Sequence, residues 1–147
     1  MNIFLKCYNM TQEDKELLLK DLCARLPYGV KAYMKKWSKL DQKYYEGVYT
    51  IESVHPSLND IYGSTENGSV EVILGYSDYD IKPYLFPMSS MTVGQGKEFA
   101  ATLKYLHAEK IDIWTLDTYD WCNKNNFDYR GLIPMGLAND ATGLNIY

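Results

Sequence analysis

The sequence predicts one α+β domain, in which a small, strongly bent antiparallel sheet or an SH3-like small barrel carries an N-terminal helix and two C-terminal helices. A helical apolar stripe near the start of the chain is followed by four or five short strand-like segments in about 60 residues. Helix-start signals return only in the last third. The 147 residues, 46% hydrophobic and 23% charged, suit a single folded domain over residues 1–147.

The first predicted element is a helix over about residues 12–26. Thr11 and Asp14 have the spacing of an N-cap residue and its partner, a weaker relative of the capping box. Apolar residues then follow at i, i+3, i+4 and i+7 on one face, namely Leu19, Leu22, Cys23 and Leu26. Pro27 ends the helix and Gly29 turns the chain.

The period then changes to that of strands. Residues 30–37 and 44–55 are rich in aromatic and β-branched side chains, which favour strands. Gly47 inside the second segment predicts a bulge or a sharp bend. Residues 55–69 are rich in turn formers, and they are expected to connect strands rather than to form one.

The Asn67-Gly68 pair predicts a hairpin turn. Alternation of apolar and polar residues predicts the next strand over residues 69–76. Residues 81–88 are expected to form a short edge strand, because Pro83 has no N–H to donate to a neighbouring strand.

The last third of the chain returns to helix signals. Thr92 and Gln95 form a capping box, and the apolar spacing after it predicts a helix that continues to about Glu109. Residues 111–116 are a short strand candidate.

A last helix begins with Asp117 or Thr118 as its cap and continues to residue 126. Several residues of the segment that follows are too apolar to remain exposed, so the tail is expected to pack on the core: Leu132, Ile133, Met135 and Leu137. Arg130 is expected to pair with Asp128 or to cover an aromatic ring.

The formal net charge of −4 is unevenly distributed. Between Tyr28 and Lys43 there are five lysines and one aspartate, a local balance of +4 that leaves −8 for the rest of the chain. A globally acidic protein is a poor general binder of nucleic acid. The lysine-rich stretch is the one region where such binding is expected.

Aromatic residues and lysines alternate along the predicted Tyr28–Tyr45 hairpin, as they do where small barrels bind nucleotides or single-stranded nucleic acid. The alternation places Lys36 on the face opposite Lys35, which divides the charge, and edge lysines also prevent aggregation. We therefore favour a solvated edge over a ligand surface. The ligand-binding candidates are Tyr33, Lys35, Trp37, Lys39, Lys43 and Tyr45 on the hairpin, with Tyr129 and Arg130 near the C-terminus.

The sequence predicts no enzyme, no cofactor and no metal ion. His55 and His107 are the only histidines, too few for a zinc site, and Cys122 is expected to be a buried structural residue. The "TVGQGKE" segment lacks the first glycine and the final Ser or Thr of a phosphate-binding loop. One metal-dependent alternative stays open, and it requires four carboxylates to converge: Asp78, Asp80, Asp112 and Asp117.

The chain is expected to act in the cytoplasm. Its three cysteines form no C-x-x-C pair, which fits free thiols in a reducing compartment. The first residues lack the pattern of a secretion signal, and no apolar run approaches the ~20 residues that span a bilayer. No membrane association is expected.

The motifs "LLLKDLCARLPYGVK", "IKPYLFPMSSMT" and "FDYRGLIPMGLA" resemble a family of short uncharacterised proteins from gut Bacteroidales genomes and their phages and mobile elements. Members begin near the equivalent of Met10, so the resemblance implies that residues 1–9 are an extension or that Met10 is an alternative start. It also implies an accessory role. Together with 14 tyrosines, it favours a non-enzymatic protein that binds a host protein.

Overall fold

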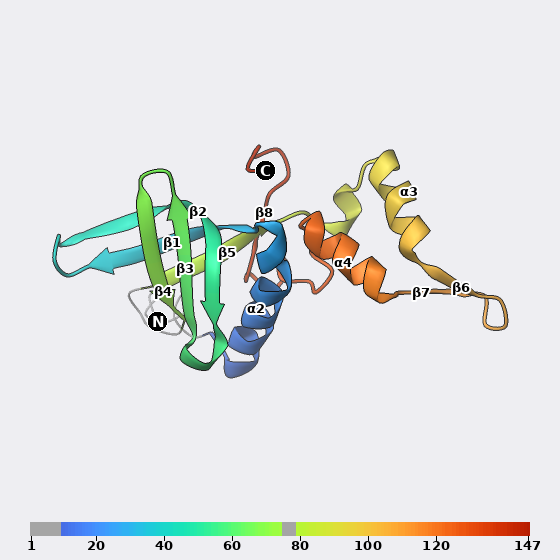
Figure 1. Ribbon diagram of the computed structural model, residues 1–147, viewed down its shortest axis with the longest axis horizontal. Coiled ribbons are helices and arrows are strands. Elements are labelled where there is room, and N and C mark those ends of the chain that lie inside the picture. Colours follow the sequence, from blue (N-terminus) through green and yellow to red (C-terminus); the bar gives the residue numbers. More distant parts are fainter. Residues whose placement is uncertain (1–9, 75–78) are drawn as a thin grey trace, which may run out of the picture.

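The computed structural model describes residues 10–74 and 79–147. A helix precedes a curved sheet, and two further helices and a small hairpin follow it (Figure 1). The helices and strands are α2 (Gln12–Arg25), β1 (Lys31–Ser38), β2 (Lys43–His55), β3 (Asp60–Thr65), β4 (Gly68–Ile73), β5 (Tyr79–Leu85), α3 (Val93–Thr102), β6 (Lys104–Leu106), β7 (Ile111–Ile113), α4 (Leu116–Lys124) and β8 (Asn139–Asp140). The α+β prediction is confirmed.

Helix α2 begins and ends within one residue of its prediction. The Thr11 hydroxyl accepts a hydrogen bond from the Asp14 N–H at 3.1 Å, so the predicted cap is present. The predicted apolar face is partly wrong, because Cys23 is exposed. The buried face is rotated to include a charged pair, and its members are Leu18, Leu19, Asp21, Leu22 and Arg25.

The main sheet has the order β4-β3-β2-β1-β5-β8. Strands β1 to β5 pair antiparallel with their neighbours, whereas β8 pairs parallel with β5. The sheet curls far enough for β4 to contact β1 and β5, yet the described residues form no ladder between β4 and β5. The strongly bent sheet is therefore confirmed, in an open form.

Two local predictions in the sheet are corrected, namely a bulge at Gly47 and an edge position for the strand that contains Pro83. Pairing of β1 with β2 continues in register through Gly47, and the irregularity lies between Ile51 and Ser53. Strand β5 is not an edge strand, because it lies between β1 and β8. Pro83 is tolerated there because β8 pairs only with the two residues that follow it.

Strand β3 was predicted as turn. Its inward-facing positions include Ile61 and Gly63, both of which are buried. Because glycine has no side chain, only one of these two positions shows the apolar residue by which a strand is recognised. The hairpin to β4 is confirmed, but its register pairs Thr65 with Gly68, which leaves Glu66 and Asn67 as the turn.

Gly63 is required by close packing. A Cβ at this position would lie 2.6 Å from Met34 Sδ and 2.8 Å from Tyr49 Cβ. We expect Gly63→Ala to lower the free energy of unfolding by about 1–3 kcal/mol, measured by urea denaturation. Gly47→Ala is the matched control, because its Cβ would meet only Tyr49 Cε2, at 3.8 Å. Equal stability of the two variants would contradict this packing.

The hydrophobic core lies between α2, the sheet and the C-terminal tail. Leu132 and Leu137 are buried and Ile133 packs against the core, so the predicted docking of the tail is confirmed for these residues. Met135 is an exception, with 49% of its surface exposed, and it lies at a turn before Gly136.

Residues 92–121 form a lobe that projects from the sheet (Figure 1). The Thr92 and Gln95 capping box of α3 is confirmed, but α3 ends at Thr102 rather than near Glu109. The Thr102 carbonyl instead accepts hydrogen bonds from the hydroxyls of Thr115 and Thr118, at 2.9 and 3.0 Å. Strands β6 and β7 form a separate hairpin where the helix was expected to continue.

The cap of α4 also differs from the prediction. Thr115 is the N-cap, and its hydroxyl accepts a hydrogen bond from the Thr118 N–H. Thr118 completes this capping box from within the helix, while Asp117 lies in the first turn. In the lobe, all of which the structure describes, Thr118 is the one buried residue.

Candidate functional site

The β1–β2 hairpin presents its candidate residues on two faces. Lys36 pairs with Tyr45, and Trp37 pairs with Tyr44. Directly paired residues of an antiparallel ladder lie on the same face, so Tyr45 shares a face with Lys36 and not with Trp37. The predicted division of the lysines between two faces is confirmed.

One face is occupied by contacts within the hairpin. Lys35 Nζ lies 4.4 Å from the centroid of the Tyr44 ring, and Trp37 contacts the same ring edge-on at 4.9 Å. The Tyr33 hydroxyl donates to a Glu46 carboxylate oxygen at 2.5 Å. These contacts engage the side chains that the sequence suggested for stacking, which weakens the case for a ligand on this face, although Tyr44 remains 50% exposed.

A hollow of about 650 Å³ lies beside the hairpin, where β4 approaches it. We call it the hairpin hollow. Three predicted candidates, Trp37, Lys39 and Tyr45, contribute to its wall. The other lining residues are Lys36, Ser38, Leu40, Tyr49, Ser69, Val70 and Glu71. The β4 residues were missed, because they reach the hairpin only through the curl of the sheet.

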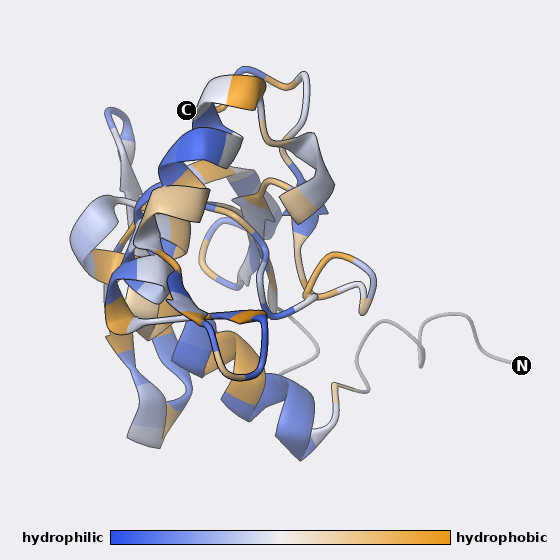
Figure 2. Cartoon of the chain, turned by 90° about the vertical axis from the view of Figure 1, so that its right-hand side faces the viewer, coloured by the Kyte–Doolittle hydropathy of each residue, from blue (hydrophilic) through white to orange (hydrophobic). Residues whose placement is uncertain are grey.

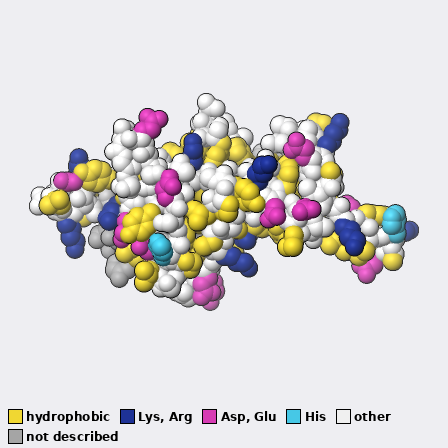
Figure 3. All heavy atoms as spheres, viewed as in Figure 1, with side chains coloured by type: hydrophobic (Ala, Val, Ile, Leu, Met, Phe, Trp, Pro, Cys, Tyr) yellow, Lys and Arg dark blue, Asp and Glu magenta, His cyan; other side chains and the backbone are white. Residues whose placement is uncertain are grey.

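Polar groups around the hollow are already oriented by neighbours. The Tyr45 hydroxyl donates to the Asp41 carboxylate, and this hydrogen bond raises the pKa of Tyr45. Lys43 Nζ lies 4.8 Å from the Tyr45 ring centroid. A hydrogen bond to Glu71 raises the pKa of Tyr62 to about 12, so Glu71 is held as an acceptor. Lysines and hydrophobic side chains lie together at this end of the molecule, on the left of Figure 3.

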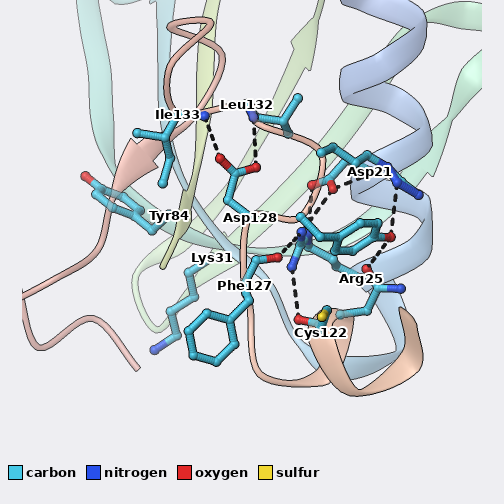
Figure 4. A network of polar contacts seen from close by, with 12 residues as sticks. Asp21, Arg25, Lys31, Tyr84, Cys122, Phe127, Asp128, Leu132 and Ile133 are labelled. Carbon is cyan, nitrogen blue, oxygen red and sulfur yellow. Dashed lines mark hydrogen bonds and ion pairs between the residues drawn. The ribbon is translucent and has the colours of Figure 1, made fainter. Parts of the chain in front are cut away.

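Tyr129 and Arg130 belong to a different region, far from the hairpin in the chain. The Arg130 guanidinium lies 4.7 Å from the Tyr129 ring centroid, and its Nη1 donates to the Tyr129 hydroxyl at 3.0 Å. Of the two predicted alternatives for Arg130, the ring contact is the one that the structure shows, and not the pairing with Asp128. Asp128 accepts hydrogen bonds from the backbone N–H groups of Leu132 and Ile133, both at 2.8 Å (Figure 4).

Arg25 is the centre of a buried polar network that the sequence did not indicate (Figure 4). Its Nε and Nη2 donate to the two oxygens of Asp21, at 2.8 and 3.1 Å. It also donates to the backbone carbonyls of Cys122 and Phe127, at 3.4 and 2.7 Å. The i, i+4 acid–base spacing on α2 was the available signal, but the carbonyls are about a hundred residues away. This network joins α2 to α4. Tyr129 and Arg130 lie beside it, because the Arg25 guanidinium is 5.4 Å from the Tyr129 ring centroid and Arg130 Nε is 3.7 Å from Asp21.

Aromatic rings connect the lobe to the body of the protein. Phe99 contacts Trp114 and Trp121 at centroid distances of 5.3 and 5.7 Å. Trp121 stacks on Phe127 at 5.4 Å with an angle of 7° between the rings. Phe127 contacts Phe86, which follows β5. The lobe is therefore attached through aromatic side chains rather than through the main core.

The lobe exposes large apolar side chains. Figure 2, which views the molecule from the side of the lobe, shows hydrophobic residues interspersed with hydrophilic ones. A shallow hollow of about 430 Å³ is lined by Ile113, Trp114, Tyr119 and Tyr129. The exposed apolar residues of the lobe are Val93 (79%), Tyr105 (47%), Ile111 (46%), Leu116 (83%) and Tyr119 (42%).

Among the residues that the structure describes, those considered for catalysis or metal binding form no cluster that could hold a metal ion. Burial raises the pKa of the Cys122 thiol to about 11, which keeps it protonated near pH 7. His55 is exposed, and His107 lies in the turn between β6 and β7 rather than at a helix end. The side chains described in residues 10–74 and 81–147 include no cluster of three metal ligands. Asp78 and the side chain of Asp80 lie outside what the structure describes, and Asp112 and Asp117 are exposed on the lobe.

Comparison with known proteins gives no match to a family model, to a curated protein or to a solved structure. Within the part of the chain that the structure describes, no helix is both long and apolar enough to cross a membrane. Two surfaces described above bear on function: the lobe, with its exposed apolar side chains, and the hairpin hollow.

Proposed function

We propose that this protein is a non-enzymatic binding protein that engages a partner protein through the lobe. The proposal rests on one observation: residues 92–121 form regular helices and strands, yet almost none of their side chains is buried. Helix α3 contains no buried residue, and no lobe residue belongs to the hydrophobic core cluster. Exposed apolar groups mark a protein interaction surface where they gather into a patch, and five large ones lie within the 30 residues of the lobe.

Composition supports a protein as the partner. Aromatic residues are enriched at protein interfaces because a rigid ring buries a large area at a small cost in side-chain entropy. In the lobe, five carboxylates outnumber three lysines, so a partner with an apolar surface and a basic rim complements it best: Glu98, Glu109, Asp112, Asp117 and Asp120 against Lys97, Lys104 and Lys110. The resemblance to proteins of phages and mobile elements makes a host protein the preferred partner.

Site-specific photocrosslinking in host cells tests this proposal. A benzoylphenylalanine at Leu116, which is 83% exposed on the lobe, is expected to give one discrete crosslinked partner. The same group at Leu58, 66% exposed between β2 and β3, is the matched control and is expected to give none. Equal products from both positions, or none from Leu116, would reject the lobe as the interface.

The crosslinked partner then allows a quantitative check. Leu116→Ala is expected to weaken the purified complex about tenfold in Kd, because central apolar contacts dominate interface energy. Leu58→Ala is expected to leave the Kd unchanged. Calorimetric titration measures both values.

A further inference from the structure

The hairpin hollow lies apart from the lobe and has the size of a small-molecule site. Its volume of about 650 Å³ falls within the range of roughly 300–1,000 Å³ that is usual for such sites. Its wall comes from β1, β2, β4 and the turn between β1 and β2. Three strands and a turn therefore converge on one space that the lobe does not use.

The hollow offers an aromatic surface for stacking. Tyr45 and Tyr49 lie on the same face of β2, four residues apart, and both line the space. Tyr49 also packs against the hydrophobic core, which fixes that side of the wall. Tyr45 is 40% exposed, and the Lys43 ammonium lies over one face of its ring, which leaves the other face for stacking. A flat, electron-rich ring system is the ligand part that such a surface accommodates best.

The hollow carries positive charge on one side and negative charge on the other. Lys36 and Lys39 line the side formed by β1 and the turn, where they provide positive charge for a phosphate. Glu71 and Ser69 line the side formed by β4. Glu71 pairs with Tyr62, on the face opposite Val70, and borders the hollow at the open edge of β4. A carboxylate accepts several hydrogen bonds, so Glu71 can accept from the exocyclic amino group of a base in addition to Tyr62.

We propose that the hairpin hollow binds a mononucleotide with an amino-bearing base. The base stacks on Tyr45, its amino group donates to Glu71, and its phosphate lies between Lys36 and Lys39. A single nucleotide is favoured over a nucleic-acid strand, because the chain outside the lysine-rich stretch carries a net charge of −8 and repels a long polyanion.

Isothermal titration of the full chain with AMP, CMP and UMP tests the proposal. AMP and CMP are expected to bind at least about tenfold more tightly than UMP, because uracil lacks the amino group. Lys39→Gln is expected to weaken AMP binding about fivefold or more, and Glu71→Gln to reduce the preference over UMP. Both side chains lie at the surface or half-buried, so the melting temperature of each variant provides the check on folding.

Trp37 provides a second readout because it borders the hollow, although its ring packs on Tyr44 on the other face of the hairpin. AMP is expected to change the tryptophan emission of the wild type, and Trp37→Phe is expected to lose this signal while calorimetric binding remains. Lys104→Gln on the lobe is the matched control for charge and is expected to bind AMP as the wild type does. If these binding experiments fail, the proposed protein interface on the lobe is unaffected, because no lobe residue lines the hollow.

Two results would overturn the inference. Absence of AMP binding at millimolar concentration, or binding that neither Lys39→Gln nor Glu71→Gln alters, would remove the site. If an oligoadenylate binds more than about a hundredfold more tightly than AMP, with a steep salt dependence, the ligand of the hollow is a nucleic-acid strand and not a mononucleotide.

Discussion

Replacing Arg25 with methionine is expected to lower the free energy of unfolding by about 3–5 kcal/mol. Arg25 and Asp21 are both fully buried, and the variant leaves the Asp21 carboxylate with the more distant Arg130 Nε, at 3.7 Å, in place of the paired Arg25 guanidinium. The carbonyls of Cys122 and Phe127 lose a charged donor at the same time. Burial of a carboxylate that has lost its two direct hydrogen bonds from Arg25 accounts for most of the expected loss.

Chemical denaturation monitored by circular dichroism measures this loss, and a double variant isolates its cause. Asp21→Leu combined with Arg25→Met removes both charges, so it is expected to be more stable than Arg25→Met alone. Arg130 Nε lies 3.7 Å from Asp21 and loses this neighbour in the double variant, which limits the recovery. A loss below about 1 kcal/mol for Arg25→Met would show that the pair contributes little net stability.

Truncation of Phe127 to alanine in the wild-type chain is expected to lower the free energy of unfolding by about 3–5 kcal/mol, in the range typical of buried aromatic residues. The residue is 1% exposed and stacks on Trp121. Its ring also contacts Phe86, and the two residues form an isolated bridge between the C-terminal segment and the end of β5. The variant therefore opens a cavity where the lobe, α2 and the sheet meet.

Phe99→Ala is the matched control for Phe127→Ala. Phe99 is half-buried, and its ring contacts Trp114 and Trp121 rather than the core. We expect a smaller change in the global denaturation midpoint and faster amide exchange confined to residues 92–121. Equal midpoints for the two variants would contradict the separation of the lobe from the core.

Local signals in the sequence predicted most of the elements but not the way they meet. Thr11 and Thr92 are helix caps recognisable from a few neighbouring residues, and both are present as predicted. Strand β3 was missed because Gly63 removes the alternation that identifies a strand. Helix α3 was extended too far because Leu103 and Leu106 keep helical spacing, whereas hydrogen bonds from α4 to Thr102 favour a hairpin.

The candidate site was predictable only in part for the same reason. Trp37, Lys39 and Tyr45 were identified from the mixture of aromatic and basic residues, and all three line the hairpin hollow. Glu71 was not identified, because its approach to the hairpin depends on the curl of the sheet. The role of Arg25 depends on carbonyl groups distant in the chain, to which no sequence pattern points.

The attachment of the lobe through a few aromatic rings bears on how this protein can evolve. Substitutions at exposed positions usually change stability by less than about 0.5 kcal/mol. Positions such as Val93 and Leu116 can therefore vary without endangering the sheet, provided that the Phe99 and Trp121 contacts persist. Recognition of a new partner can then be acquired by drift on the lobe, while selection for folding acts on a separate set of residues.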